Sequence, residues 1–198
     1  MVVVEDQALV RDAISRLLNF EPDIRVVGAA ADGLAGQALI QAARPHIALL
    51  DVELPAMDGL RLAEAVRRDS PQTVVAMLTT FGRPGYVERA LAAGAKGFLL
   101  KEHPVAHLAD DIRRLQAGAI VVDQELAVAA LVSGGNPLSA RERDILRRVG
   151  QGEGVAAMAA ALHLSVGTVR NYLSAAMQKL SASTRWDAAR RAEECGWL

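Results

Sequence analysis

Residues 46–51 read HIALLD, an apolar run that ends in a carboxylate. Strands covered on both faces have such near-continuous apolar runs, and they belong to parallel sheets. Besides His46–Leu50, the strand candidates are Val2–Val4, Arg25–Ala30, Thr73–Leu78 and Gly97–Leu100, and three of the five are near-continuous apolar runs. Amphipathic helical patterns lie between and after these runs, near residues 7–19, 33–43, 58–68, 85–94 and 104–117. Five strand–helix units of this length predict an α/β fold with a doubly wound, five-stranded parallel sheet.

The composition excludes several classes of protein. The chain has 198 residues, of which 52% are apolar and 23% charged, which excludes intrinsic disorder. No apolar run approaches the roughly 20 residues of a membrane span, so we expect no membrane insertion. The single Cys195 excludes a disulfide framework or a metal site built from cysteines. Because Val2–Val4 is followed at once by Glu5 and Asp6, the start is not a signal peptide, and we expect a soluble, cytoplasmic protein.

A change of pattern after Gly118 indicates a second domain. Residues 1–133 carry 17 acidic and 13 basic side chains, whereas residues 134–198 carry 6 and 9, so the second part is the more basic. A short helical stretch, Gln124–Val132, leads into Ser133-Gly134-Gly135-Asn136-Pro137, which is typical of a linker. Helical patterns follow near residues 139–150, 155–161, 166–180 and 184–194. We therefore predict a first domain at 1–117, a linker with a short helix at 118–137, and an all-α domain at 138–198.

Polar side chains follow four of the predicted strands at the same register. They are Glu5-Asp6, Asp51, Thr79-Thr80 and Lys101. Because ligands of open α/β sheets bind at the carboxyl ends of the strands, these groups are expected to converge. Clustered carboxylates repel one another unless a cation compensates them, and Mg²⁺ prefers such oxygen ligands. Taken singly, each acid could be a solvated loop residue or a helix cap; their common register favours a shared site.

The set Glu5-Asp6, Asp51, Met57-Asp58-Gly59, Thr79 and Lys101 resembles the receiver domain of bacterial two-component response regulators, over residues 1 to about 117. The resemblance implies that a sensor histidine kinase phosphorylates Asp51. It implies that Asp6, Asp51 and the backbone carbonyl of Glu53 hold Mg²⁺, and that Glu5 supports the ion without direct contact. It further implies that Thr79 and Lys101 bind the phosphoryl group, and that Phe98 occupies the aromatic switch position. Without a hydroxyl group, Phe98 could act only through packing.

The later helices have the pattern of a helix-turn-helix. Ser139 is expected to cap a helix with Glu142 as its capping-box partner, and Ser165 to cap the longest helix. That helix has one apolar face, at Val169, Leu173, Met177 and Leu180. Its polar residues lie off this face; they are Thr168, Arg170, Asn171, Ser174 and Lys179. A plain four-helix bundle with a solvated polar face would give a similar helical pattern.

Three short motifs resemble the LuxR-type DNA-binding domain of NarL/FixJ-family regulators. They are Leu138-x-x-Arg141-Glu142, Leu164-Ser165-x-x-Thr168-Val169-Arg170 and Lys179-Leu180. The resemblance implies that Arg170, Asn171 and Ser174 enter the major groove, whereas Thr168 and Lys179 contact phosphates. Because the small, weakly basic second domain alone offers few phosphate contacts, we expect a homodimer on phosphorylation. A two-fold dimer would bind double-stranded DNA at an imperfect palindrome, and RNA polymerase is a further expected partner. The helix before the turn departs from the family, because Gly152-Glu153-Gly154 offers it no hydroxyl cap.

Residues 79–86, TTFGRPGY, and residues 167–174, GTVRNYLS, are similar to the DesR-type branch of these regulators. That branch controls fatty-acid desaturase expression in response to membrane fluidity, so control of membrane-lipid genes is an expectation. Two other classes of protein share part of this pattern. Phosphatases that form an aspartyl-phosphate carry a second Asp two residues on, where this chain has Glu53. A receiver that binds only proteins would not need the polar helix at 166–180. We therefore predict a transcription regulator and not an enzyme.

Overall fold

A computed structural model describes residues 1–80, 83–102, 104–133 and 135–198. Of the motifs quoted above, Phe81, Gly82 and Gly134 lie outside the described residues. The chain divides into two compact units, Met1–Gly82 with Val87–Ala129, and Arg83–Tyr86 with Ala130–Leu198.

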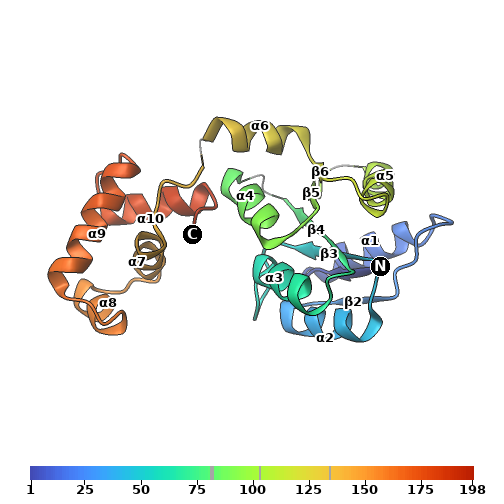
Figure 1. Ribbon diagram of the computed structural model, residues 1–198, viewed down its shortest axis with the longest axis horizontal. Helices are drawn as coiled ribbons and strands as arrows, with labels where there is room; N and C mark the ends of the chain where they lie inside the picture. Colours follow the sequence, from blue (N-terminus) through green and yellow to red (C-terminus); the bar gives the residue numbers. More distant parts are fainter. Residues whose placement is uncertain (81–82, 103, 134) are drawn as a thin grey trace. The chain divides into compact units, whose positions relative to one another are not determined.

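The first unit is built on a parallel sheet with the strand order β2-β1-β3-β4-β5-β6 (Figure 1). The strands are β1 (Val2–Val4), β2 (Gly28–Ala30), β3 (Ile47–Asp51), β4 (Val74–Thr79), β5 (Gly97–Leu100) and β6 (Val121–Val122). All five residues of β3 are buried, as the apolar run of its first four residues predicts. The predicted doubly wound α/β fold is confirmed.

The sheet differs from the prediction at its two edges. A sixth strand, β6, pairs with β5 over only two residues, which is too short for any periodicity to be read from the sequence. The strand expected at Arg25–Ala30 begins at Gly28 instead. The backbone N–H of Val26 donates to the Asn19 side chain at 2.8 Å, so a local side-chain contact replaces strand pairing at that residue.

Helices cover both faces of the sheet. They are α1 (Ala8–Leu18), α2 (Gly33–Ala43), α3 (Gly59–Asp69), α4 (Pro84–Ala93) and α5 (Val105–Gln116). On one face α1 and α5 pack Leu18 and Ile112 against Val3 and Leu49 of the sheet. Helices α2 and α3 lie side by side on the other face (Figure 1). Gly36 permits α2 to lie close against β1, because a Cβ atom there would lie 2.9 Å from the Val4 methyl groups.

The last part of the chain is helical, with α6 (Gln124–Ser133), α7 (Ala140–Gly150), α8 (Val155–Ala161), α9 (Val166–Lys179) and α10 (Arg185–Glu194). Helices α7–α10 share one buried core. The capping box at Ser139 and Glu142 and the cap at Ser165 are both present, as predicted. Across the part of the chain that the structure describes, none of the helices combines the length and the apolar character needed to cross a bilayer.

Candidate phosphoacceptor site and DNA-binding helix

Three carboxylates meet at the carboxyl end of the sheet. Glu5 and Asp6 follow β1, and Asp51 ends the neighbouring strand β3. One carboxylate oxygen from each of the three lies within 4.8 Å of the others. Glu5 and Asp51 are 1% and 5% exposed, whereas Asp6 is exposed to solvent. These oxygen donors fit a hard divalent cation such as Mg²⁺, and Asp6 leaves the cluster open to an ion from solvent.

The Lys101 ammonium group joins two of these carboxylates. Lys101 follows β5, and its Nζ atom lies 2.6 Å from Glu5 Oε2 and 2.9 Å from Asp51 Oδ2. Its side chain is only 8% exposed, so both ion pairs are shielded from water. Two buried carboxylates of like charge would repel each other without this cation. The structure therefore brings together Glu5, Asp51 and Lys101, as the order of the strand ends predicts.

The pKa values of this group reflect burial and mutual charge. Burial raises the pKa of Glu5 above its ordinary value, and the charge of Asp51 acts in the same direction, while the bond from Lys101 opposes them. For Lys101, burial lowers the pKa, but the bonds to Glu5 and Asp51 outweigh it and hold the pKa above its ordinary value. Lys101 thus remains a cation at neutral pH.

The loop after β3 holds the Asp51 backbone in close contact with α3. The Gly59 N–H donates to the Val52 carbonyl at 3.0 Å, and Asp58 caps α3 by accepting from the Arg61 N–H at 2.8 Å. A Cβ atom at Gly59 would lie 1.9 Å from the Asp51 carbonyl oxygen, which no side chain can tolerate. The close packing of Gly59 against the Asp51 carbonyl group therefore fixes where Asp51 stands. Beyond Asp51, the Glu53 N–H lies 3.4 Å from Asp51 Oδ1.

Thr79 and Phe98 occupy the neighbouring strands of the same edge. Thr79 ends β4 and is 3% exposed, and its carbonyl accepts a hydrogen bond from the Lys101 N–H at 2.9 Å. Phe98 lies in β5, opposite Met77 of β4, and is completely buried. The structure thus ties the backbones of Thr79 and Lys101 together and places Phe98 inside the core, three residues before Lys101.

Helix α9 presents a polar face beyond a capped first turn. Ser165 Oγ accepts from the Thr168 N–H at 3.0 Å and lies 2.8 Å from Thr168 Oγ1. On the next turns Arg170, Asn171 and Ser174 are exposed. The opposite face, Val169, Leu173, Ala176 and Leu180, is buried, and Met177 packs partly against it. Such a helix can offer its polar side chains to a groove while its apolar face holds it on the domain.

Comparison with known proteins identifies both units. Residues 1–113 match the response regulator receiver domain, and residues 136–192 match the bacterial regulatory proteins of the luxR family. The chain belongs to the LuxR-type response regulators. It is 40% identical over its full length to the uncharacterized transcriptional regulatory protein YvfU of Bacillus subtilis, covering 98% of that protein. It is 37% identical to the transcriptional regulatory protein DesR of the same organism, over 99% of this chain and 97% of DesR.

Solved structures agree with this membership. The response regulator ChrA of a heme-sensing two-component system is 29% identical, with a TM-score of 0.59, over 100% of this chain and 97% of ChrA. A complex of the response regulator RcsB with DNA has the same fold, with a TM-score of 0.69 at 22% identity, over 98% of this chain and 96% of RcsB. This response regulator is a DNA-binding transcription regulator of a two-component system, as the sequence motifs predict.

One contact of the response regulator was not foreseen from its sequence. Lys179 Nζ lies 2.7 Å from Glu142 Oε2, and thereby links the end of α9 to the start of α7. Glu142 could be foreseen as a capping residue of α7, but nothing local indicates a partner 37 residues away. The missing cap of α8 was foreseen: Gly154 precedes the helix without a side-chain hydrogen bond. An ion pair between Arg148 and Glu153, at 2.9 Å, closes the preceding turn instead.

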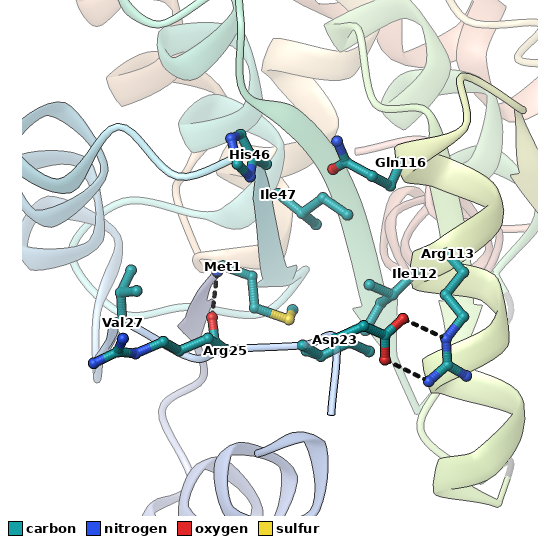
Figure 2. A pocket seen from close by; sticks show the side chains of 10 residues that line it. Met1, Asp23, Arg25, Val27, His46, Ile47, Ile112, Arg113 and Gln116 are labelled. Atoms are coloured by element: carbon teal, nitrogen blue, oxygen red, sulfur yellow. Dashed lines mark hydrogen bonds and ion pairs between the residues drawn. The ribbon is translucent and has the colours of Figure 1, made fainter. Parts of the chain in front are cut away.

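The pocket in Figure 2 lies at the other end of the sheet, away from the carboxylates. It has a volume of about 500 Å³ and includes Met1 and Ile47, which stand at the starts of β1 and β3. Arg113 of α5 donates twice to Asp23 at 2.8 Å, and this contact lowers the pKa of Asp23 to about 2. These bonds join α5 to the loop before β2, so the charged groups of Asp23 and Arg113 belong to the packing at this end of the sheet.

Proposed function

We propose that Asp51 of this response regulator accepts a phosphoryl group from a sensor histidine kinase. One observation carries the proposal: the Asp51 carboxylate is bonded to Lys101 in a buried site, with Asp6 exposed beside it. In the transfer, an Asp51 carboxylate oxygen attacks phosphorus, the phosphorus–nitrogen bond of the phosphohistidine breaks, and the imidazole keeps the electron pair. Lys101 is placed to pair with an oxygen of the group that arrives.

The residues around Asp51 fit a magnesium ion. Asp6 and Asp51, with the backbone carbonyl of Glu53, would hold Mg²⁺, and Glu5 would support it while remaining bonded to Lys101. When bound, the ion neutralises phosphoryl oxygens and so lowers the barrier to attack by a carboxylate. The exposed Asp6 gives a cation direct access to the two buried carboxylates.

Phosphorylation would reach the rest of the first unit through Thr79 and Phe98. The new dianion on Asp51 attracts the Thr79 hydroxyl, because a hydroxyl can donate to a phosphoryl oxygen. Since Thr79 shares a backbone hydrogen bond with Lys101, movement of β4 is passed to the end of β5, where Phe98 is packed. We propose that Phe98 then changes its packing and that this alters the surface presented to other molecules.

The output of this change is proposed to be dimerisation and tighter promoter binding. A single helix-turn-helix unit with a small excess of basic residues offers few phosphate contacts, so linking two copies would raise affinity strongly. In the proposed complex Arg170, Asn171 and Ser174 read bases and Thr168 contacts a phosphate. The operator would be an imperfect palindrome whose half-sites lie about one helical turn apart.

The proposed domain boundaries are 1–117 for the receiver, 118–137 for the linker and 138–198 for the DNA-binding domain. RNA polymerase is a proposed further partner of the bound dimer. Control of membrane-lipid genes is proposed from the similarity to the DesR-type branch in residues 79–86 and 167–174. Footprinting on genomic fragments, with and without a phosphoryl donor, would identify the operators and so test both the palindrome and the target genes.

Labelling with acetyl phosphate and Mg²⁺ tests the phosphoacceptor. Wild-type protein should incorporate one labelled phosphoryl group, and Asp51→Ala should incorporate none. Asp58→Asn is the matched control, because Asp58 stands in the same loop and Asn also caps helices well. This variant should be labelled like the wild type. Label on Asp51→Ala, at any residue, would show that Asp51 is not the acceptor.

Sedimentation with and without beryllofluoride tests the output step. Beryllofluoride with Mg²⁺ mimics the phosphoryl group on a carboxylate, so it should convert monomer to dimer in wild-type protein and leave Asp51→Ala unchanged. A wild-type protein that stays monomeric under both conditions would contradict the dimerisation step, whereas the labelling result would stand.

A further inference from the structure

The start of α7 contains a buried carboxylate that accepts two different hydrogen bonds. Glu142 is 3% exposed, and its Oε2 atom accepts a hydrogen bond from the Ser139 N–H at 2.6 Å. The same oxygen accepts from Lys179 Nζ at 2.7 Å. The first bond closes the capping box of α7, and the second reaches the last turn of α9. A single oxygen atom therefore connects the first helix of the domain with the helix that carries the proposed base contacts.

The ion pair has one buried partner, Glu142, whereas the Lys179 side chain that reaches it is partly exposed. Although burial by itself raises the pKa of Glu142, the bond from Lys179 and those with Ser139 outweigh burial and hold the pKa below its ordinary value. A buried carboxylate that loses its cation keeps the cost of desolvation without the compensating attraction. The domain therefore favours the arrangement in which the end of α9 stays against α7.

The position of Lys179 bears on how α9 meets DNA. Lys179 is in the last turn of α9, more than two turns beyond Arg170, and its side chain is 39% exposed. The first turn of α9 is fixed by its own cap at Ser165, and the middle by the buried face around Leu173. The bond to Glu142 fixes the far end, and thus the direction of the helix axis relative to α7.

We propose that Lys179 is a positioning residue, which acts through Glu142 to set the direction of α9, and that it does not act as a phosphate contact. This inference rests on the proposed recognition of bases by α9. It replaces the role in phosphate binding that the sequence motif predicts for Lys179. Base contacts at Arg170 and Asn171 depend on the helix axis, whereas contacts with the DNA backbone tolerate small rotations.

The substitution Glu142→Gln separates the two roles because they give opposite results. Gln can still accept the Ser139 N–H and preserve the capping box, but it carries no charge for Lys179. If Lys179 contacts phosphate, this change releases its ammonium group and removes a negative charge, so DNA binding tightens and its salt dependence steepens. If Lys179 positions α9 through Glu142, the same change weakens specific binding.

The experiment measures binding of the full chain, with beryllofluoride and Mg²⁺, at several salt concentrations. The probes are an operator duplex identified by footprinting and a scrambled duplex of the same composition. The variants are Glu142→Gln, Lys179→Met, their combination, and Lys179→Arg, which can restore the ion pair. Gln178→Met is the matched control, because Gln178 is the exposed neighbour of Lys179 on α9. Tryptophan fluorescence during thermal unfolding verifies that each variant is folded at the assay temperature.

We expect Glu142→Gln and Lys179→Met each to weaken operator binding about tenfold, as loss of a hydrogen bond between charged groups would. The combination should be no weaker than either variant alone, because both remove the same contact. Binding to the scrambled duplex and the salt slope should stay near the wild-type values, and Lys179→Arg should regain operator binding. The control should bind like the wild type.

Two results would overturn the inference while leaving DNA recognition by α9 intact. One is tighter binding by Glu142→Gln. The other is an equal loss on both duplexes for Lys179→Met, with a salt slope lower by about one unit, which is the mark of a phosphate contact. A wild-type protein that binds both duplexes equally would instead contradict the proposed base recognition itself, and the inference with it.

Discussion

Replacement of Gly59 by Ala tests whether the loop after β3 fixes the position of Asp51. The new Cβ atom would stand 1.9 Å from the Asp51 carbonyl oxygen and 3.0 Å from Met77 Cε. Because contacts of a Cβ atom below about 3 Å are not tolerated, the Asp51 peptide or the start of α3 must move by about 1 Å. A shift of this size in a reacting group costs about 100-fold in rate. Overpacking of this kind also costs about 1–3 kcal/mol in the free energy of unfolding.

The assay compares the rate of labelling by acetyl phosphate with the midpoint of thermal unfolding. Gly59→Ala should be labelled about 100-fold more slowly than the wild type at a temperature where it remains folded. Gly150→Ala is the matched control, since no atom lies within 4 Å of a Cβ built there. It should be labelled at the wild-type rate and be slightly more stable, because Gly150 is the last helical residue of α7 and Ala has a higher helix propensity than Gly. Normal labelling and stability of Gly59→Ala would refute the idea that close packing at Gly59 positions Asp51.

Three further predictions concern charge and base reading. Lys101→Met should lower the free energy of unfolding of the first unit by about 3 kcal/mol, because it leaves buried Glu5 and Asp51 without their cation. Calorimetry without metal would measure this loss of stability, and added Mg²⁺ should reduce it. Folding lowers the pKa of Glu142, so the ionised carboxylate stabilises the C-terminal unit at every pH above the ordinary Glu pKa. This contribution to the free energy of unfolding should be lost as the pH falls through the lowered pKa of the folded state. Glu142→Gln should remove the pH dependence, which tryptophan fluorescence during unfolding would measure. Arg170→Ala should lower discrimination between operator and scrambled duplex by about 1–3 kcal/mol in binding titrations.

Much of the fold could be predicted because the apolar sequences of the central strands indicate that both of their faces are buried. The apolar run Ile47–Leu50 of β3 is typical of a strand buried on both faces. The edges of the sheet escaped prediction for a physical reason. A pair of residues such as Val121–Val122 has no period, and the length of β2 depends on the contact between Asn19 and Val26. The pairing of these edge strands depends on residues that are close in space but distant in sequence, so the local sequence pattern does not predict it.

The candidate site shows the same division between local and distant information. The strand ends could be aligned from the sequence, so the meeting of Glu5, Asp51 and Lys101 was predictable. The way in which Lys101 divides its bonds between the two carboxylates was not, because it depends on side-chain geometry. The ion pair between Glu142 and Lys179 was not predictable either. The capping box accounts for Glu142 and the LuxR-type motif accounts for Lys179, so neither residue indicates the other as its partner.

The charges at the strand ends give a reason why a metal ion and a phosphoryl group would act together in this site. Glu5, Asp6 and Asp51 carry three negative charges when ionised, and the Lys101 ammonium group supplies one positive charge. The remaining charge of two matches a divalent cation. A phosphoryl group on Asp51 would replace one negative charge by about two, so the balance reached with Mg²⁺ would be lost again. Further donors must then approach, and the Thr79 hydroxyl, at the end of the adjacent strand, is the neutral donor placed to do so. In this proposal the charge imbalance at Asp51 is itself the force that moves β4.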